Sequence, residues 1–105
     1  MRDVERGEVW QMDFGMAAKV RPALVLGCDV ADEDRVLVAV IYHTTALRGS
    51  RYEVAMRVTG LEAGGFGAQS LYTIPATRLL RRRAVLNAEQ MSAVENRVKL
   101  WLGLR

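Results

Sequence analysis

Cysteine and histidine are almost missing from this sequence of 105 residues, and their scarcity excludes several kinds of site. The single cysteine, Cys28, cannot form a disulfide within the chain, so we expect a small buried side chain in a reducing compartment. Cys28 and the single histidine, His43, fall short of the ligands that a zinc site needs, and nothing places them together as a catalytic pair. We therefore expect no metal and no other cofactor.

Long apolar runs and low-complexity segments are also missing. No stretch approaches the length of a membrane-spanning helix, about 20 apolar residues, and the charged opening MRDVERGEVW is unlike a signal peptide. The chain has no internal repeat and no linker. We expect one domain over residues 1–105, located in the cytoplasm, with no membrane partner.

The composition is that of a globular, mildly basic domain. Half of the residues (50%) are hydrophobic and 26% are charged, which is enough apolar material for one modest core. The net charge of +3 is compatible with a nucleic-acid partner but does not require one.

Short runs with the features of β-strands dominate the first three quarters of the chain. The first run alternates, with Trp10, Met12 and Phe14 on one face, and the second begins at Pro22, where the missing N–H is tolerated. Residues 59–67, TGLEAGGFG, hold four of the nine glycines and predict a turn or bulge. The five predicted strands are 7–14, 22–28, 35–42, 51–58 and 68–74.

Helical signals follow from Pro75. Residues 75–80 predict one short helical turn, a basic run of three arginines follows, and residues 86–104 predict a helix. Asn87 and Gln90 have the spacing of a capping box, and Gly103 is the expected stop. The apolar stripe expected to face the core is Met91, Val94, Val98 and Trp101 or Leu102. These elements predict a mainly β (α+β) fold: a small SH3-like antiparallel barrel of about five strands whose open face or edge is covered by the C-terminal helix.

The usual catalytic motifs do not occur. There is no nucleophile elbow and no phosphate-binding glycine loop between a strand and a helix, so an enzyme built on this chain must work by positioning and charge. Cleavage of RNA allows this, because the substrate carries its own nucleophile, the 2'-hydroxyl. Such an enzyme needs a cation for the developing phosphorane charge, and Arg21, just before Pro22, is one candidate.

Residues 42–51, YHTTALRGSR, offer a second group of polar side chains. An apolar strand is expected to end at His43, Thr44 and Thr45, beside a loop that carries Arg48. Polar groups at a strand end next to a basic loop suit an anion pocket. The ordinary alternative is that the threonines cap the strand and that His43 is a surface or hydrogen-bonded histidine.

Taken together, RGEVWQMDF, RPALVL, HTTALRG, YEVAM, SLYTIPATRL and the closing LNAEQMSAVENRVKLWLGL resemble the MazF/PemK family of toxin endoribonucleases, in the same order and over nearly the whole chain. The resemblance implies an SH3-like barrel that forms a homodimer. It also implies metal-independent cleavage of single-stranded RNA or mRNA at short sequences, leaving a 2',3'-cyclic phosphate. A further implied partner is a cognate, MazE-like antitoxin whose disordered tail occupies the RNA groove.

The same resemblance implies that Arg21 and Thr44 are the catalytic pair. Arg21 would stabilise the phosphorane, and Thr44 would hydrogen-bond the scissile phosphate or relay a proton. The residues expected to bind RNA are Lys19, Thr45, Arg48 and Gln69. Neighbouring strand residues point to opposite faces, so if Thr44 faces the cleft we expect that His43 does not, and that cleavage largely survives its loss.

Three features depart from the family pattern. The loop at residues 15–20, GMAAKV, is shorter than in many relatives, Gln69 replaces an acidic residue of some relatives, and Pro75 replaces an Asp of many. Two other functions therefore remain open. One is a toxin of the same fold that binds gyrase, as the CcdB group does without the Arg/Thr pair. The other is a non-catalytic barrel that binds nucleic acid, for which few exposed aromatic side chains are expected.

Overall fold

The computed structural model describes residues 4–15, 19–29, 31 and 35–104, so three residues of the short loop, 16–18, lie outside the described part. The described part contains a seven-stranded sheet and one α-helix, as expected for the fold class but with two more strands than predicted. In chain order the elements are β1 (Glu8–Asp13), β2 (Val20–Gly27), β3 (Leu37–Thr44), β4 (Glu53–Met56), β5 (Gly64–Gly67), a 3-10 turn (Ala68–Ser70), β6 (Tyr72–Pro75), a second 3-10 turn (Ala76–Arg78), β7 (Leu79–Val85) and α1 (Ala88–Leu102).

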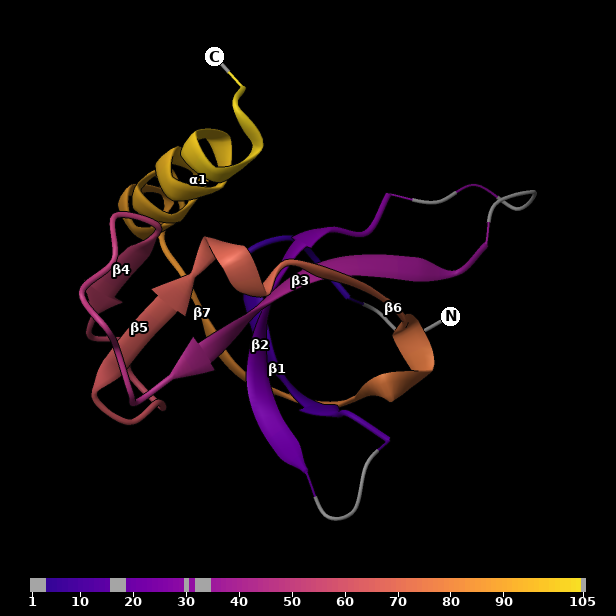
Figure 1. Ribbon diagram of the computed structural model, residues 1–105. Coiled ribbons are helices and arrows are strands. Elements are labelled where there is room, and N and C mark those ends of the chain that lie inside the picture. The colour runs from indigo at the N-terminus through magenta and orange to yellow at the C-terminus, as the bar shows by residue number, and fades with distance from the viewer. Residues whose placement is uncertain (1–3, 16–18, 30, 32–34, 105) are drawn as a thin grey trace.

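The sheet is antiparallel throughout, and β3 is its central strand. The strand order is β4-β5-β3-β2-β1-β7, and β6 pairs with β3 as well (Figure 1). β5 and β6 lie end to end on one side of β3, because β6 pairs with Leu37 to Val40 and β5 pairs with His43 and Thr44. β2 occupies the other side of β3.

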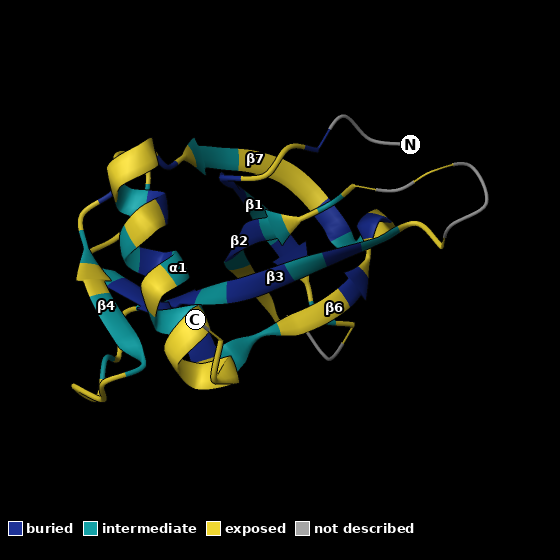
Figure 2. Cartoon of the chain, turned by 90° about the horizontal axis from the view of Figure 1, so that it is seen from above, coloured by how far each residue is buried: buried dark blue, intermediate teal, exposed yellow. Residues whose placement is uncertain are grey.

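Both faces of the central strands are buried, as predicted for the second strand. Val25 and Val40 belong to one apolar cluster, whereas their neighbours Leu24 and Ile41 belong to another. Because side chains alternate along a strand, the two clusters lie on opposite faces of β2 and β3. The second cluster includes Val94 of α1, which lies on one side of the sheet next to β4 (Figure 2).

The glycine-rich segment forms a strand, so the prediction of a turn or bulge was wrong for Gly64–Gly67. A Cβ on Gly64 would overlap the carbonyl oxygen of Thr44, and a Cβ on Gly65 would overlap that of Val54. Glycine therefore lets the backbones of β3 and β4 approach β5 closely. Phe66, which follows these two glycines in β5, is fully buried.

Other boundaries also differ from the prediction. β2 begins at Val20, so Pro22 is its third residue and not its first. Of the predicted strand 68–74, only the part from Tyr72 belongs to a strand, because Ala68–Ser70 is a 3-10 turn. The run of three arginines is part of β7, which pairs with β1. The short helical turn after Pro75 is present at Ala76–Arg78.

Helix α1 begins and ends as predicted. Asn87 and Gln90 form the capping box, and Gly103 ends the helix in the left-handed conformation at φ 71°. Of the predicted stripe, Met91 and Val94 are buried in the second cluster, and Val98 packs against it partly buried. The prediction that Trp101 or Leu102 continues the buried stripe was wrong, since Trp101 is 42% exposed and Leu102 is 48% exposed.

Within the described ranges, no helix has the length and apolarity needed to cross a membrane.

Candidate active site

The candidate site forms where β3 parts from β2. The two strands pair as far as Ala23 with Tyr42, and the next residues of β3, His43 and Thr44, pair with β5 instead. His43 and Thr44 are thus still strand residues, so the strand ends two residues later than the predicted 35–42. The first residues of β2 are left without a partner on this side, and a cleft opens between the two strands.

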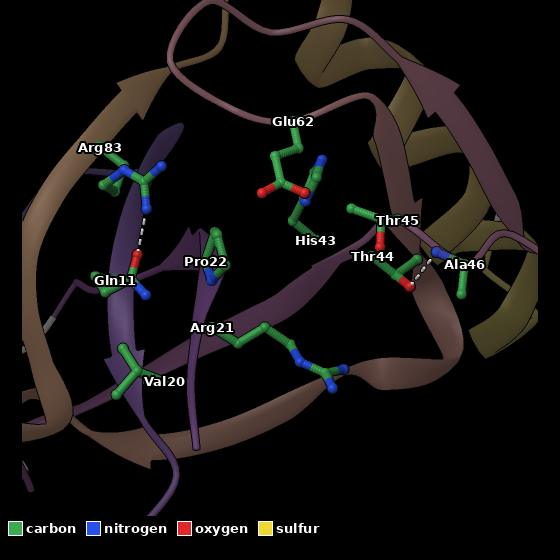
Figure 3. Close-up of a pocket in the computed structure, with 10 residues that line it drawn as sticks. All are labelled: Gln11, Val20, Arg21, Pro22, His43, Thr44, Thr45, Ala46, Glu62 and Arg83. Carbon is green, nitrogen blue, oxygen red and sulfur yellow. Dashed lines mark hydrogen bonds between the residues drawn. The ribbon is translucent and has the colours of Figure 1, made fainter. Parts of the chain in front are cut away.

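Two clefts border this opening, and Arg21 and Thr44 line both of them. The first has a volume of about 370 Å³ and the second about 400 Å³, within the range of small-ligand sites. The first is lined by Gln11, Val20, Arg21, Pro22, His43, Thr44, Thr45, Ala46, Glu62 and Arg83 (Figure 3). The second is lined by Arg21, Tyr42, Thr44, Arg48, Tyr52, Glu53, Gly67, Gln69, Ser70 and Tyr72.

Arg21 presents an exposed positive charge at the boundary of the clefts. Its guanidinium carbon lies 5.8 Å from the centre of the Phe14 ring and 6.0 Å from that of Tyr42. These contacts orient the guanidinium without neutralising it. In the described part of the chain the ion pairs are those of Arg6 and Arg82, so Arg21 has no carboxylate partner there. Its charge is available to an anionic ligand.

Thr44 holds the start of the following loop. Its hydroxyl oxygen accepts a hydrogen bond from the backbone N–H of Ala46 at 3.0 Å (Figure 3). Its own hydrogen is not donated to any of the described residues, so it is available to a ligand. Further along, Glu53 accepts hydrogen bonds from the backbone N–H groups of Arg48 at 2.9 Å and Ser50 at 3.1 Å. The loop that carries the basic groups is thereby fixed at both ends.

His43 is buried, only 4% exposed, with its ring 5.3 Å from that of Phe66. Burial lowers the pKa of His43, although the backbone and the carboxylate of Glu62 act to raise it. Its Nε2 atom has no hydrogen-bond partner among the residues that the structure describes. Thr44 is half-exposed, as alternation requires, but both side chains border the first cleft because that cleft lies between the strands (Figure 3).

The residues expected to bind RNA are divided between the clefts. Thr45 lines the first, whereas Arg48 and Gln69 line the second. Lys19 is exposed just before β2 but lines neither. Arg51, in the same basic loop as Arg48, lies over the ring of Tyr52 at 4.8 Å and lines neither cleft.

Sequence analysis missed two components of the site. Arg83 of the basic run donates a hydrogen bond to the Gln11 side chain at 2.5 Å, at one wall of the first cleft (Figure 3). Tyr42, Tyr52 and Tyr72 together line the second cleft. Alternation along the strands would place these side chains on the cleft side of the sheet. That prediction can be made only when the pairing register of the strands is known.

Among the described residues, no group of three or more His, Cys, Asp or Glu side chains could hold a metal ion.

Comparisons with known proteins bear on the fold and the family. The chain is similar to an endoribonuclease in complex with its cognate antitoxin from a mycobacterial species, at 22% identity over 97% of both chains with a TM-score of 0.82. It is similar to the Mycobacterium tuberculosis toxin MazF-mt6, at 27% identity over 93% of this chain and 98% of that one, with a TM-score of 0.78. A third similar structure is the MazE-MazF complex (Form-II) from Deinococcus radiodurans, at 22% identity over 97% of both chains and a TM-score of 0.78.

The comparison with curated proteins gives no match. The family model described as PemK-like, MazF-like toxin of type II toxin-antitoxin system matches residues 5–102, which is nearly the whole chain. This chain therefore belongs to the PemK-like, MazF-like family of toxins of type II toxin–antitoxin systems.

Proposed function

We propose that this toxin is an endoribonuclease that cleaves single-stranded RNA, including mRNA, at short sequences and without a metal ion. The observation that carries the proposal is the position of Arg21 and Thr44 at the common wall of two clefts: a cation with no carboxylate partner among the described residues, and a hydroxyl donor. RNA supplies the nucleophile itself, so a site of this kind needs only to orient the backbone and stabilise charge. The similar endoribonuclease from a mycobacterial species supports the same reaction class.

In the proposed reaction the scissile phosphate binds at Arg21 and Thr44, with one flanking nucleotide in each cleft. The 2'-oxygen loses its proton to solvent and forms a bond to phosphorus, while the bond from phosphorus to the 5'-oxygen breaks. The 5'-oxygen takes up a proton, and the products are a 2',3'-cyclic phosphate and a 5'-hydroxyl. Arg21 neutralises the charge that builds on the non-bridging oxygens, and the Thr44 hydroxyl donates to one of them.

His43 has a structural role in this proposal. A general base must reach the proton that it removes, and His43 is only 4% exposed with its ring packed on Phe66. Gln69 cannot take a proton either, because an amide is not basic at neutral pH. We propose that Gln69, with Lys19, Thr45 and Arg48, binds the RNA and leaves proton transfer to solvent.

We also propose two protein partners. The similar Deinococcus and mycobacterial toxins occur in complexes with antitoxins, which supports a MazE-like antitoxin for this chain. We propose a homodimer as well, in which the two-fold axis places two copies of the Arg21 site along one groove. An antitoxin segment lying in that groove would block both sites.

The test is cleavage of single-stranded RNA by the purified protein in the presence of EDTA. We expect cleavage by the natural chain and a loss of at least about 100-fold in rate for Arg21→Ala. Arg35→Ala is the matched control, because Arg35 is exposed before the opposite end of β3 and lines neither cleft. RNA that stays intact with folded, dimeric protein would contradict the proposal.

The same variant separates the other candidate functions. If Arg21→Ala remains toxic in cells, the target is a protein, as for a gyrase-binding toxin. If the natural chain binds RNA in a salt-dependent manner but yields no fragments, it is a non-catalytic binder.

A further inference from the structure

The rings of Phe14, Tyr42 and Tyr72 form a row beside Arg21, and two of them, Tyr42 and Tyr72, line the second cleft. Phe14 and Tyr42 meet edge to face, with ring centres 4.4 Å apart and planes at 77°. Tyr42 and Tyr72 are stacked, with ring centres 5.1 Å apart and planes only 18° from parallel. The row joins the end of β1, the middle of the sheet and β6, so its geometry is set by three separate segments.

The strand register explains why Tyr42 and Tyr72 stack. Tyr72 pairs with Val40 across the antiparallel β3–β6 ladder, which makes Tyr42 its diagonal neighbour. Diagonal neighbours share a face of the sheet and are within reach when their side chains are aromatic. The pair is therefore held by the backbone and is available before any ligand arrives.

Tyr72 is the open end of this row. One face of its ring lies on Tyr42, yet the residue is 52% exposed. An exposed aromatic face beside a positively charged group is typical of sites that bind single-stranded nucleic acid. The ring spacing leaves no gap between Tyr42 and Tyr72, so a planar ligand can stack only on the outer face of Tyr72.

We propose that the outer face of Tyr72 is a stacking site for the nucleobase next to the phosphate held by Arg21 and Thr44. The inference rests on the proposed function, since it names a contact between this toxin and single-stranded RNA. The second cleft has walls for both parts of a nucleotide: Arg21 and Thr44 for the phosphate, Tyr72 for the base. Because every base has a π-face, the contact favours an unpaired base of any identity.

The site differs from a simple basic patch in what it requires of the RNA. Phosphate contacts weaken with salt and do not depend on the bases. Stacking on Tyr72 requires a base at one position, and it requires an aromatic ring but no hydroxyl at residue 72. Both requirements can be measured without cleavage.

The experiment measures binding of a 2'-O-methyl RNA 12-mer, which cannot be cleaved, by fluorescence anisotropy. The 12-mer carries a mapped cleavage site, or a mixed sequence if the natural chain cuts none. We expect Tyr72→Ala and Tyr72→Leu to weaken binding by about 5- to 100-fold and Tyr72→Phe to stay within about twofold of the natural chain. Thr73→Ala is the matched control, since Thr73 is exposed on the same strand and lines neither cleft.

A scan with abasic nucleotides identifies the contact directly. Removing the base at one position should weaken binding to the natural chain as much as Tyr72→Ala does, and should have little further effect on the Tyr72→Ala protein. Tyr72→Leu keeps an apolar side chain, so it provides the same test if Tyr72→Ala does not fold.

The outcomes separate this site from the nuclease itself. If the natural chain cleaves RNA but Tyr72→Ala and Tyr72→Leu bind the 12-mer as tightly as it does, the stacking site is wrong and the nuclease stands. If no RNA is cleaved but one abasic position is coupled to Tyr72, the stacking site stands and the nuclease is wrong. Equal abasic effects at all positions in both proteins also overturn the stacking site.

Discussion

Arg21 and Thr44 lie on adjacent strands, two residues beyond the last β2–β3 pair, and line the same two clefts. If the ladder continued past Ala23 and Tyr42, the two residues would face each other as partners. It does not continue, because the end of β3 turns to pair with β5. In the proposed nuclease, the strand register therefore aligns the catalytic pair, and the divergence of the two strands leaves room for a phosphate between them.

Loss of the Thr44 hydroxyl should affect cleavage more than stability. Thr44→Val keeps the branched shape that suits a strand but removes the donor, so we expect the cleavage rate to fall by about 10- to 100-fold. Thr44→Ser keeps the hydroxyl and should retain most of the rate. The comparison is made by initial rates of fragment formation, with thermal unfolding as the check on folding. Equal rates for the valine and serine variants would remove Thr44 from the reaction.

Replacement of His43 should leave most of the cleavage activity. General acid–base catalysis contributes about 100- to 10,000-fold, so His43→Gln should lower the rate by less than about tenfold if His43 does not transfer protons. The rate is measured at neutral pH on protein shown to be folded and dimeric. A folded dimer without activity would make His43 a catalytic residue.

His43 should also make stability depend on pH. Burial lowers the pKa of His43 in the folded chain, so below the usual value of 6.5 the unfolded chain takes up the proton first. Protonation then favours unfolding, and the contribution present above pH 6.5 is lost as the pH falls toward the lower, folded pKa. Urea unfolding between pH 8 and pH 5.5 should show this decline in the natural chain and a weaker one in His43→Gln. Identical pH profiles would contradict a buried neutral histidine.

Local sequence patterns correctly predicted the elements whose defining residues all lie within one short stretch of the chain. The β-branched run of β3 and the capping box at Asn87 and Gln90 are complete in the sequence, and both are present. The Arg21 and Thr44 pair came from the resemblance, and the structure places both at the same clefts. Their roles in the reaction stay predictions.

Elements defined by distant contacts could not be predicted in the same way. The four residues Gly64–Gly67 have the composition of a turn. They form a strand because the backbones of β3 and β4 lie so close on either side that no larger residue fits at Gly64 or Gly65. β7 was not predicted as a strand because it contains three consecutive arginines. Charged side chains are nevertheless common on the end strand of a sheet, and the Arg82 side chain is 59% exposed there. The stacking of Tyr42 on Tyr72 depends on the pairing of Val40 with Tyr72, which no local sequence pattern specifies.

The close approach around β5 gives a prediction for glycine. Gly64→Ala puts a methyl group into the carbonyl oxygen of Thr44, so we expect a loss of about 3 kcal/mol in the free energy of unfolding and reduced cleavage. Gly27→Ala is the matched control, because the nearest atom to its added Cβ is the Ala39 Cβ at 3.9 Å, an ordinary contact. Urea unfolding checks both. A Gly64→Ala protein as stable as Gly27→Ala would show that β3 and β5 can separate without cost.

The buried carboxylate of Glu8, the first residue of β1, should make a pH-dependent contribution to the free energy of unfolding. Burial alone would raise the pKa of Glu8, but hydrogen bonds from the Glu5 backbone, the Trp10 indole and Arg82 outweigh it, so the pKa lies below 4.5. The stabilisation is therefore present above pH 4.5 and is lost as the pH falls through the lower, folded pKa. The three donors lie at 2.8, 3.0 and 3.0 Å from the carboxylate.

We expect Glu8→Gln to lower the free energy of unfolding by about 1.5–3 kcal/mol at pH 7, since it weakens several hydrogen bonds to a buried charge. The difference from the natural chain should shrink as the pH falls below 4.5, where the natural carboxylate becomes protonated as well. Arg82→Ala is the internal comparison, because the Arg82 side chain is 59% exposed and its ion pair should contribute less than about 1 kcal/mol. If Arg82→Ala costs as much as Glu8→Gln, the ion pair and not the buried hydrogen bonds stabilises this end of β1. Denaturant unfolding of the three proteins from pH 7 to pH 3 separates the two cases.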